Sequence, residues 1–311
     1  LRNHYGAQVK VVGYIDDDPI KQNQTILGYP VLGTRSDLLQ VAAEQQVDEI
    51  VISMPSVPRR VVRELVNLAQ QTGRVVKILP GVYDLLEGNV TVSKIREVQI
   101  EDLLGRDPVI VDLEGMSAYL SNKVVLVTGA GGSIGSELCR QIAHFKPKTL
   151  LLLDFSENNL YDIEMELKAE ASVSLVALVK DIQDGAAIDD VFQMYKPEVV
   201  FHAAAHKHVP LMEQNPEEAI KNNVYGTYQV ARAAHTYGAK KFVLVSTDKA
   251  VNPTSVMGAS KRIAEMIIQY LDSLSETSFV AVRFGNVLGS RGSVIPLFRK
   301  QIMAGGPGAV T

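Results

Sequence analysis

Short apolar runs alternate with amphipathic segments along most of the chain. In the second half, these runs predict six strands, at residues 123–127, 149–153, 174–179, 199–203, 241–246 and 279–283. Segments with helical periodicity separate the runs, at residues 134–142, 157–170, 187–195, 213–237 and 257–270. The alternation predicts a doubly wound parallel sheet with crossover helices, which binds its ligands at the carboxyl ends of the strands.

The first hundred residues repeat the alternation on a smaller scale. They predict a small parallel sheet, with strands at 9–15, 49–53 and 75–79 and helices at 36–45 and 58–71. Because residues 1–6 resemble the end of a helix, we expect the first strand and glycine loop of this domain to be missing. Residues 81–121 show no clear periodicity and predict a linker. We therefore expect an α/β protein with two Rossmann-like domains, 1–100 and 101–311.

Composition excludes several classes of function. A formal net charge of -4 with 21% charged residues leaves no basic excess for binding nucleic acid. Tryptophan is absent and aromatic residues make up 6%, which argues against base-stacking platforms. No apolar run reaches the length of a membrane span, and a single cysteine, Cys139, excludes a disulfide within the chain. We expect a small-molecule substrate and no nucleic-acid partner.

The strand at 123–127 leads into a turn that is almost free of side chains. Glycines at 129, 132 and 135 have the spacing Gly-x-x-Gly-x-x-Gly. Such a turn suits close approach of the backbone to a pyrophosphate at a helix N-terminus, although a glycine turn can also serve packing alone. Asp154 ends the next strand, nineteen residues after Gly135, where an acidic side chain meets a ribose 2′-hydroxyl. Together these features predict a dinucleotide site.

Polar residues also end the other predicted strands. They stand at 181–182, 202–205, 246–249 and 283–286, and the topology brings these strand ends to one edge of the sheet, so we expect one crevice. His202, His206 and His208 have a spacing that metal ligands can show. However, no carboxylate or cysteine accompanies them, and Lys207 would repel a cation. We expect these histidines to shape a sugar or phosphate pocket, without a metal.

The richest segments resemble a known family. Residues 245–261 read Val-Ser-Thr-Asp-Lys-Ala-Val-Asn-Pro-Thr-Ser-Val-Met-Gly-Ala-Ser-Lys, with Thr-Gly-Ala-Gly-Gly-Ser-Ile-Gly upstream and Arg-Phe-Gly-Asn-Val-Leu-Gly-Ser-Arg-Gly-Ser-Val downstream. These motifs resemble the extended short-chain dehydrogenase/reductases. More closely, they resemble the UDP-N-acetylglucosamine 4,6-dehydratases of bacterial polysaccharide and glycan biosynthesis.

The resemblance implies a setting for the chain. In large members of the family, transmembrane helices and a nucleotide-binding-fold domain precede the catalytic domain, and a substrate-covering segment follows it. The chain would then be an internal piece, truncated on its C-terminal side. It would belong to a homo-oligomer on the cytoplasmic side of the bacterial inner membrane, and membrane contact would come only through segments outside residues 1–311.

The resemblance also implies a catalytic centre. The superfamily normally uses Tyr-x-x-x-Lys to take the proton of the alcohol that is oxidised. Lys261 keeps the lysine position and would hold the nicotinamide ribose, but Met257 stands at the tyrosine position, where a thioether does not accept a proton. The large dehydratases share this departure, which implies that residues 247–249 do the chemistry instead. We assign Thr247 as the base for the C4 hydroxyl of the sugar. Lys249 would be the base for its C5 proton, and Asp248 the acid for its C6 oxygen.

By the same resemblance the cofactor is NAD and the substrate a UDP-sugar. The cofactor would contact Gly129, Gly132, Ser133, Ile134, Gly135, Asp154, Asp181, Ile182, Ala203, Ala204 and Lys261. The substrate side would comprise His206, Lys207, Asn223, Asn252, Met257, Asn286, Ser290 and Arg291, with Asn223 supporting the active-site backbone. Asp154 with no arginine close behind it favours NAD over NADP.

Other interpretations stay open. A nucleotide-sugar 4-epimerase uses the same oxidation at C4 but needs the tyrosine that Met257 replaces. A binding module could hold NAD as a redox sensor without turnover, and the site could be an inactive remnant. The pair Asp248-Lys249 favours the dehydratase, because elimination of water requires an acid and a base that epimerisation does not need.

Overall fold

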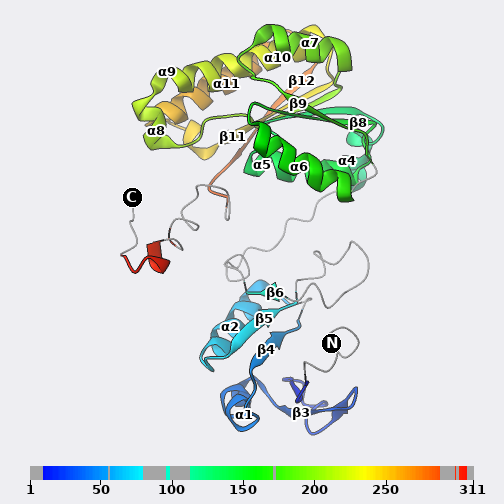
Figure 1. The fold of residues 1–311 in the computed structure, drawn as a ribbon, viewed down its shortest axis with the longest axis vertical. Helices are drawn as coiled ribbons and strands as arrows, with labels where there is room; N and C mark the ends of the chain where they lie inside the picture. Colours follow the sequence, from blue (N-terminus) through cyan, green and yellow to red (C-terminus); the bar gives the residue numbers. More distant parts are fainter. Residues whose placement is uncertain are drawn as a thin grey trace. The chain divides into compact units, whose positions relative to one another are not determined.

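The alternating strands and helices separate into two structural units. The computed structural model describes residues 10–54, 57–79, 96–98, 113–170, 173–287, 298 and 301–306 (Figure 1). The units are Leu1–Ile110 and Val111–Thr311. The sequence places the domain boundary after residue 100, in a stretch, 99–112, that lies outside the described residues.

The larger unit contains a six-stranded sheet in which every neighbouring pair is parallel. Its strands lie in the order β12-β11-β10-β7-β8-β9 (Figure 1). They are β7 Val124–Thr128, β8 Thr149–Asp154, β9 Leu175–Val179, β10 Val199–His202, β11 Lys241–Thr247 and β12 Ser278–Phe284. The strand order reverses between β7 and β10, where a doubly wound sheet binds its ligands. The predicted fold class and the six predicted strands are confirmed.

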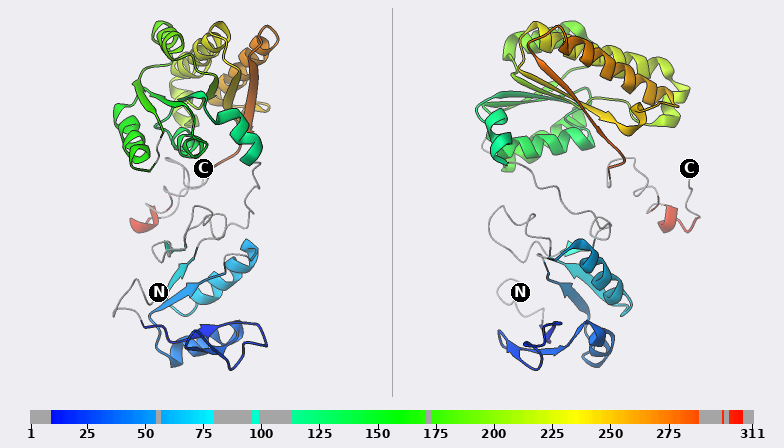
Figure 2. Two further views of the ribbon diagram at one scale, coloured as in Figure 1. Left: turned by 90° about the vertical axis from the view of Figure 1, so that its right-hand side faces the viewer. Right: turned by 180° about the vertical axis from the view of Figure 1, so that it is seen from behind.

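Helices cover both faces of this sheet (Figure 2). One layer contains α4 Leu113–Leu120, α5 Ser133–His144 and α6 Glu157–Glu170. The other contains α7 Gly185–Tyr195, α10 Thr227–Thr236 and α11 Val256–Asp272. Leu126 of β7 packs in the core with α7, α10 and α11, whereas Val125 and Val127 pack with α4, α5 and α6. Burial on both faces explains why the strands read as continuous apolar runs. Among the helices that the structure describes, none is both long and apolar enough to cross a bilayer.

The single helix predicted at 213–237 is wrong. The chain there forms α8 Val209–Gln214, α9 Pro216–Ala219, the π-helical segment η5 Ile220–Gly226, and α10. Asn215 leaves the helical region, with φ -135° and ψ 62°, and Pro216 has no N–H to continue the hydrogen-bond ladder. The π-helical segment buries both Asn222 and Asn223, which are consecutive in the sequence. Such segments often occur at functional sites.

A second difference concerns the stretch without periodicity, 81–121. Residues Leu113–Leu120 form α4, and Leu120 is buried beneath the sheet. The helix reads Leu-Glu-Gly-Met-Ser-Ala-Tyr-Leu, which is short and has a single charged residue, so its sequence shows no amphipathic pattern. The predicted linker at 81–112 lies outside the described residues apart from 96–98.

The described residues of the smaller unit form two short sheets, and the prediction of one parallel sheet is wrong. Their strand orders are β1-β3-β2 and β4-β5-β6, and each sheet has one parallel and one antiparallel pair. The elements are β1 Tyr14–Ile15, β2 Thr25–Ile26, β3 Tyr29–Gly33, the short turn η2 Arg35–Asp37, α1 Leu38–Glu44, β4 Glu49–Ile52, α2 Arg59–Gln70, β5 Val75–Ile78 and β6 Arg96–Glu97. Both predicted helices are present, and so are the strands predicted at 49–53 and 75–79. The predicted helix end at 1–6 lies outside the described residues.

A two-residue turn accounts for the antiparallel pair of β2 and β3. Leu27 and Gly28 connect the strands with φ values of 50° and 86°, and two positive values in succession define a type I′ turn. Asparagine is the residue usually found before the glycine of such turns. Leu27 adopts a left-handed backbone conformation that is unfavourable for leucine, and its side chain is 86% exposed.

Replacing Leu27 by Asn should stabilise the smaller unit by about 1 kcal/mol, because asparagine tolerates the left-handed region that leucine disfavours. The denaturation midpoint of this unit measures the gain. Leu27→Ala serves as the control, since it removes the same exposed side chain without favouring the turn. An equal gain in both variants would show that the turn is not responsible.

Candidate active site

The glycine turn joins β7 to α5 and lies against the end of β10. Gly129 has φ 69°, and a Cβ at this residue would lie 2.7 Å from the backbone nitrogen of Ala204. A Cβ on Gly135 would collide with the carbonyl oxygen of Gly129. The turn therefore has no room for side chains at these two positions. Gly132 is the N-cap residue of α5, which puts residues 133–134 in the first helical turn, where backbone N–H groups bind anions.

Asp154 ends β8 beside this turn and is fixed by two backbone groups. It is 7% exposed, and its Oδ2 accepts a hydrogen bond from the Gly131 N–H at 2.9 Å. Its Oδ1 accepts one from the Ser156 N–H at 2.9 Å. The carboxylate is thus held at the rim of the glycine turn, in one orientation.

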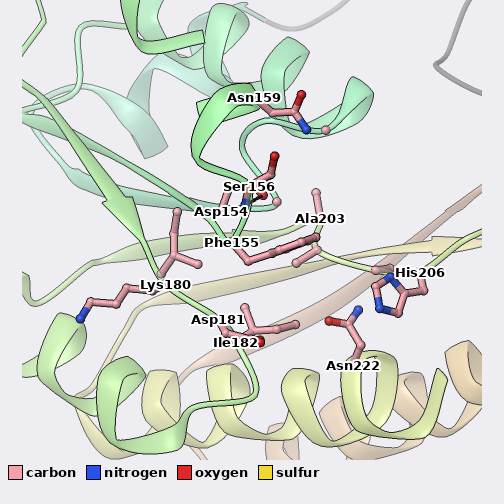
Figure 3. Close-up of a pocket in the computed structure, with 15 residues that line it drawn as sticks. Asp154, Phe155, Ser156, Asn159, Lys180, Asp181, Ile182, Ala203, His206 and Asn222 are labelled. Atoms are coloured by element: carbon pink, nitrogen blue, oxygen red, sulfur yellow. Dashed lines mark hydrogen bonds between the residues drawn. The ribbon is translucent and has the colours of Figure 1, made fainter. Parts of the chain in front are cut away.

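A pocket opens at the carboxyl ends of β7, β8, β9 and β10 (Figure 3). The predicted site residues that line it are Gly129, Gly132, Asp154, Asp181, Ile182, Ala203, Ala204 and His206. Asn159, Lys180 and Asn222 also line it, although the sequence did not single them out. Lys180 and Asn222 each stand directly before a predicted residue, and that adjacency is the signal that could have found them. Figure 3 shows the ammonium end of Lys180 pointing away from the other labelled residues.

His202 is buried, and its predicted place at the edge of the crevice is wrong. Its Nδ1 lies 2.7 Å from Thr128 Oγ1, and its Nε2 lies 2.9 Å from Thr227 Oγ1. The Thr227 hydroxyl donates its proton to the Asn223 carbonyl at 2.7 Å, so it accepts from the Nε2–H of His202, and Thr128 donates to Nδ1. Burial, reinforced by the charge of Lys261, lowers the pKa of His202 to about 3. A neutral His202 therefore links β7, β10 and α10.

Asn223 extends this link to the loop after β10. Its Oδ1 accepts from the His206 N–H at 2.8 Å, and its Nδ2 donates to the His206 carbonyl at 2.9 Å and to Ser260 Oγ at 3.0 Å. Asn222 donates to the same Oδ1 at 3.1 Å. Because Asn223 is fully buried with these partners, it suits support of the backbone and not direct contact with a substrate.

Lys261 lies inside the unit, beneath the end of β11. It is 4% exposed, and its Nζ donates a hydrogen bond to the Val245 carbonyl at 2.8 Å. Burial lowers the pKa of Lys261 to about 8, against the opposing effect of the Glu265 charge. At neutral pH the side chain is thus a buried ammonium group held by the strand that leads to Thr247.

Three predicted catalytic residues form an exposed cluster at the end of β11. Thr247 Oγ1 donates to Asp248 Oδ1 at 2.9 Å, and Lys249 Nζ donates to the same oxygen at 3.2 Å. Lys249 Nζ also donates to Oδ1 of Asn286, beyond β12, at 3.3 Å. Hydrogen bonds from Thr247 and Lys249 lower the pKa of Asp248, so it is a carboxylate at neutral pH. The structure therefore brings a hydroxyl, a carboxylate and an ammonium group into direct contact.

Three further predicted substrate residues differ in exposure. Met257 is 4% exposed and packs with Met212 and Ala219, so its thioether lies in an apolar cluster. Asn252 is exposed and has φ 55°, a left-handed conformation that asparagine tolerates. Lys207 is exposed in the loop after β10. Ser290 and Arg291 lie outside the described residues.

The three histidines do not converge. His202 is in the core, His206 lines the pocket, and His208 is the N-cap residue of α8. Within the part of the chain that the structure describes, no group of three or more His, Cys, Asp or Glu residues is arranged to hold a metal ion.

Comparison with known proteins identifies the family. Residues 125–311 match the model of the polysaccharide biosynthesis protein family. The chain belongs to this family. Residues 1–80 match the model of a CoA-binding domain. The family that the motifs of the sequence indicated is confirmed.

Individual relatives agree with this assignment. EpsC of Bacillus subtilis, a probable polysaccharide biosynthesis protein, is 50% identical over 302 residues, which make up 96% of this chain and 50% of EpsC. The inverting UDP-N-acetylglucosamine 4,6-dehydratase of Campylobacter jejuni is 35% identical over 190 residues, 60% of this chain and 55% of the dehydratase. The structure of Pen from Bacillus thuringiensis has a TM-score of 0.57 and 38% identity, covering 60% of this chain and 58% of Pen. The chain thus spans about half the length of these relatives.

Lys261→Met should raise the free energy of unfolding at pH 7 by about 1–2 kcal/mol, because it removes a buried charge. The folded-state pKa, about 8, lies below the ordinary value of 10.5, so the cost to the folded state is full below pH 8 and is relieved as the pH rises from 8 to 10.5. The advantage of the variant should shrink over that range. Urea titrations at several pH values measure it, with the exposed Lys240→Met as the control. A constant difference between pH 7 and 10.5 would contradict the shifted pKa.

Proposed function

We propose that the protein is a nucleotide-sugar 4,6-dehydratase that converts UDP-N-acetylglucosamine into a UDP-4-keto-6-deoxy sugar for polysaccharide or glycan biosynthesis. The observation that carries this proposal is the cluster of Thr247, Asp248 and Lys249, which holds three proton-transfer groups in contact at one strand end. Family membership and the similarity to the Campylobacter dehydratase support the substrate class. Elimination of water needs an acid and a base, and this cluster offers both.

The pocket at the same sheet edge suits NAD. The start of α5 forms a cradle that a Cβ at Gly129 or Gly135 would fill, and Asp154 supplies a fixed carboxylate at its rim. NAD would be held by the glycine turn with residues 133–134, by Asp154, Asp181 and Ile182, and by Ala203 and Ala204, with Lys261 on the nicotinamide ribose. When bound, NAD would supply the hydride acceptor for C4 of the sugar and, once reduced, the hydride donor for C6.

The hydrogen bonds within the cluster suggest a path for the C4 proton. Thr247 accepts the proton of the C4 hydroxyl while passing its own proton to Asp248, to which it already donates at 2.9 Å. Asp248 is a carboxylate before this step and a carboxylic acid after it. It then protonates the C6 oxygen, which leaves as water. One proton thus travels from the C4 hydroxyl to the departing water.

Lys249 takes the C5 proton and later returns it. It acts as the base in its neutral, amine form. The side chain of Lys249 is 41% exposed, and its Nζ lies 3.3 Å from Oδ1 of Asn286. The acid and the base of the elimination thus lie side by side at the end of β11.

The remaining assignments stay part of the proposal. Asn286, Asn252, His206 and Lys207 would contact the UDP-sugar, together with Ser290 and Arg291, while Asn223 supports the backbone. We also propose that the full protein is a homo-oligomer at the cytoplasmic side of the bacterial inner membrane, anchored by segments outside this chain.

An epimerase is less well supported by the geometry. Epimerisation at C4 returns the hydride to C4 and needs one acid–base group there, normally the tyrosine. Met257 replaces it and is buried against Met212, so no hydroxyl stands at that position. The Asp248 and Lys249 pair would have no task in an epimerase.

Variants of the cluster should separate the partial reactions. Lys249→Met should lower turnover about a hundredfold or more and accumulate reduced cofactor, because the C5 proton has no base. Thr247→Val and Asp248→Asn should both show little reduced cofactor, since each breaks the path of the C4 proton. Absorbance of NADH after mixing with UDP-N-acetylglucosamine measures the outcome. Accumulation of NADH by Asp248→Asn would show that Asp248 acts only on the C6 oxygen, and normal dehydration by the Lys249 variant would show that the cluster is not the catalytic centre.

The same pocket should bind NAD at least about tenfold more tightly than NADP, because the fixed Asp154 carboxylate repels a 2′-phosphate. Asp154→Asn should lower the ratio of NAD affinity to NADP affinity. Calorimetric titration with both cofactors measures it, and Asp162→Asn, which removes an exposed carboxylate from α6, is the control. An unchanged ratio in Asp154→Asn would mean that another group selects the cofactor.

A further inference from the structure

A buried carboxylate that the proposed mechanism does not use ties together the two strands that carry the catalytic cluster. Glu265 lies on α11, one turn after Lys261, and its side chain is 2% exposed. It accepts hydrogen bonds from Ser246 Oγ at 2.6 Å, from Arg283 Nε at 2.8 Å and from Arg283 Nη2 at 2.6 Å. Arg262 Nη1 donates a fourth at 3.1 Å. The side chain therefore joins α11 to β11 and β12.

The two strand residues that contact Glu265 are neighbours on adjacent strands. Ser246 of β11 is paired in register with Arg283 of β12. Along β11, Phe242 and Leu244 are fully buried in the core that contains α11, and Ser246 is the next buried residue of that row. Glu265 thus lies where the apolar layer between helix and sheet gives way to polar groups, at the strand ends.

The residues directly beyond this junction belong to the catalytic cluster. Thr247 follows Ser246, and Asn286 stands three residues after Arg283. At the exposed end, the two segments meet through Lys249, which donates to Asp248 at 3.2 Å and to Asn286 at 3.3 Å. Because those contacts are long and solvent-exposed, they are weak. The pairing of β11 with β12 continues to Thr247 and Phe284, and the bonds to the buried Glu265 carboxylate add a stronger side-chain restraint on the two strand ends than the contacts of Lys249 do.

Glu265 is ionised at neutral pH. Burial on its own would raise the pKa of this carboxyl, but hydrogen bonds from Arg283, Ser246 and Arg262 outweigh burial and lower the pKa to about 2. The carboxylate therefore makes charge-assisted bonds at neutral pH, including a bidentate one to Arg283. Such bonds fix direction as well as distance.

We propose that Glu265 is a positioning residue, which holds the ends of β11 and β12 so that Asp248 and Lys249 lie beside Asn286. The inference rests on the proposed dehydratase function, because that reaction requires the cluster to be aligned with the sugar. Glu265 itself touches no reacting atom. Its loss should therefore impair the chemical step more than the binding of cofactor or substrate.

Glu265→Gln in the full-length protein tests this role. The amide keeps the shape but places an NH₂ group opposite a donor, so kcat should fall about tenfold or more while KM and the Kd for NAD stay within about twofold. Two controls separate position from stability. Glu166→Gln breaks the comparable two-pronged pair with Arg140 between α5 and α6, and Arg262→Ala removes the bond to Glu265 that comes from its own helix. Both should leave kcat per folded molecule within about twofold.

Amide hydrogen exchange gives a readout that needs no substrate. Glu265→Gln should speed exchange at residues 246–249 and 283–286, and Glu166→Gln should not. If wild type does not convert UDP-N-acetylglucosamine, the proposed function fails, and the exchange result still decides whether Glu265 holds the strand ends. If the glutamine variant does not fold, Ser246→Ala, which cuts one tie and keeps Arg283, should give the same changes to a smaller degree. Unchanged exchange at both strand ends, or faster exchange with unchanged kcat, would overturn the proposal.

Discussion

A chain of buried hydrogen bonds runs from the end of β7 to the helix that carries Lys261. Thr128 donates to His202, His202 to Thr227, and Thr227 to the carbonyl of Asn223, whose side chain in turn holds His206 and reaches Ser260. Each link has a fixed donor and acceptor, so the chain specifies directions that apolar packing leaves free. Breaking one link would leave a buried polar group unpaired, at a cost of about 1–3 kcal/mol. This chain of hydrogen bonds therefore holds the pocket wall and the loop after β10 in position relative to α11.

The ionisable groups of the site differ in burial according to their proposed roles. Groups proposed to move protons, Asp248 and Lys249, are exposed, and solvent can reach them. Groups that fix geometry, such as Glu265 and His202, are buried, and hydrogen-bond partners keep Glu265 ionised whereas burial keeps His202 neutral. Lys261 stands between the two classes, because it is buried yet titrates near neutral pH. A site of this kind keeps its shape while the protonation state of its working groups changes.

The parts of the fold that could be predicted are those whose physical cause is local in the sequence. The strands of the larger unit are buried on both faces and therefore read as unbroken apolar runs, and the glycine spacing follows from the space that the turn leaves. The hairpin at Leu27 was missed because leucine is an uncommon residue in that turn. The break at Asn215 was missed because the apolar periodicity continues on both sides of it.

The candidate site shows the same limit for side chains. A polar residue at a strand end has the same sequence pattern whether it faces the crevice or the core, since adjacent residues of a strand point to opposite faces, and His202 was assigned to the wrong one. Glu265 carries no signal in the sequence, because a glutamate on an amphipathic helix is usually solvated. Its partners Ser246 and Arg283 come from two strands far from it in the chain, and only the fold unites the three.

The π-helical segment Ile220–Gly226 has a consequence for how this protein can change in length. Within an α-helix, consecutive residues are turned by about 100°, and the wider turn of a π-helix lets the neighbours Asn222 and Asn223 both face inward. Losing one residue here would let the segment wind as an α-helix, in which one residue fewer completes about the same rotation, so α10 would keep its orientation and Val230 and Ala234 their place in the core, but Asn222 and Asn223 could no longer both face inward. The extra residue of this segment therefore serves the paired asparagines of the site and not the packing of α10.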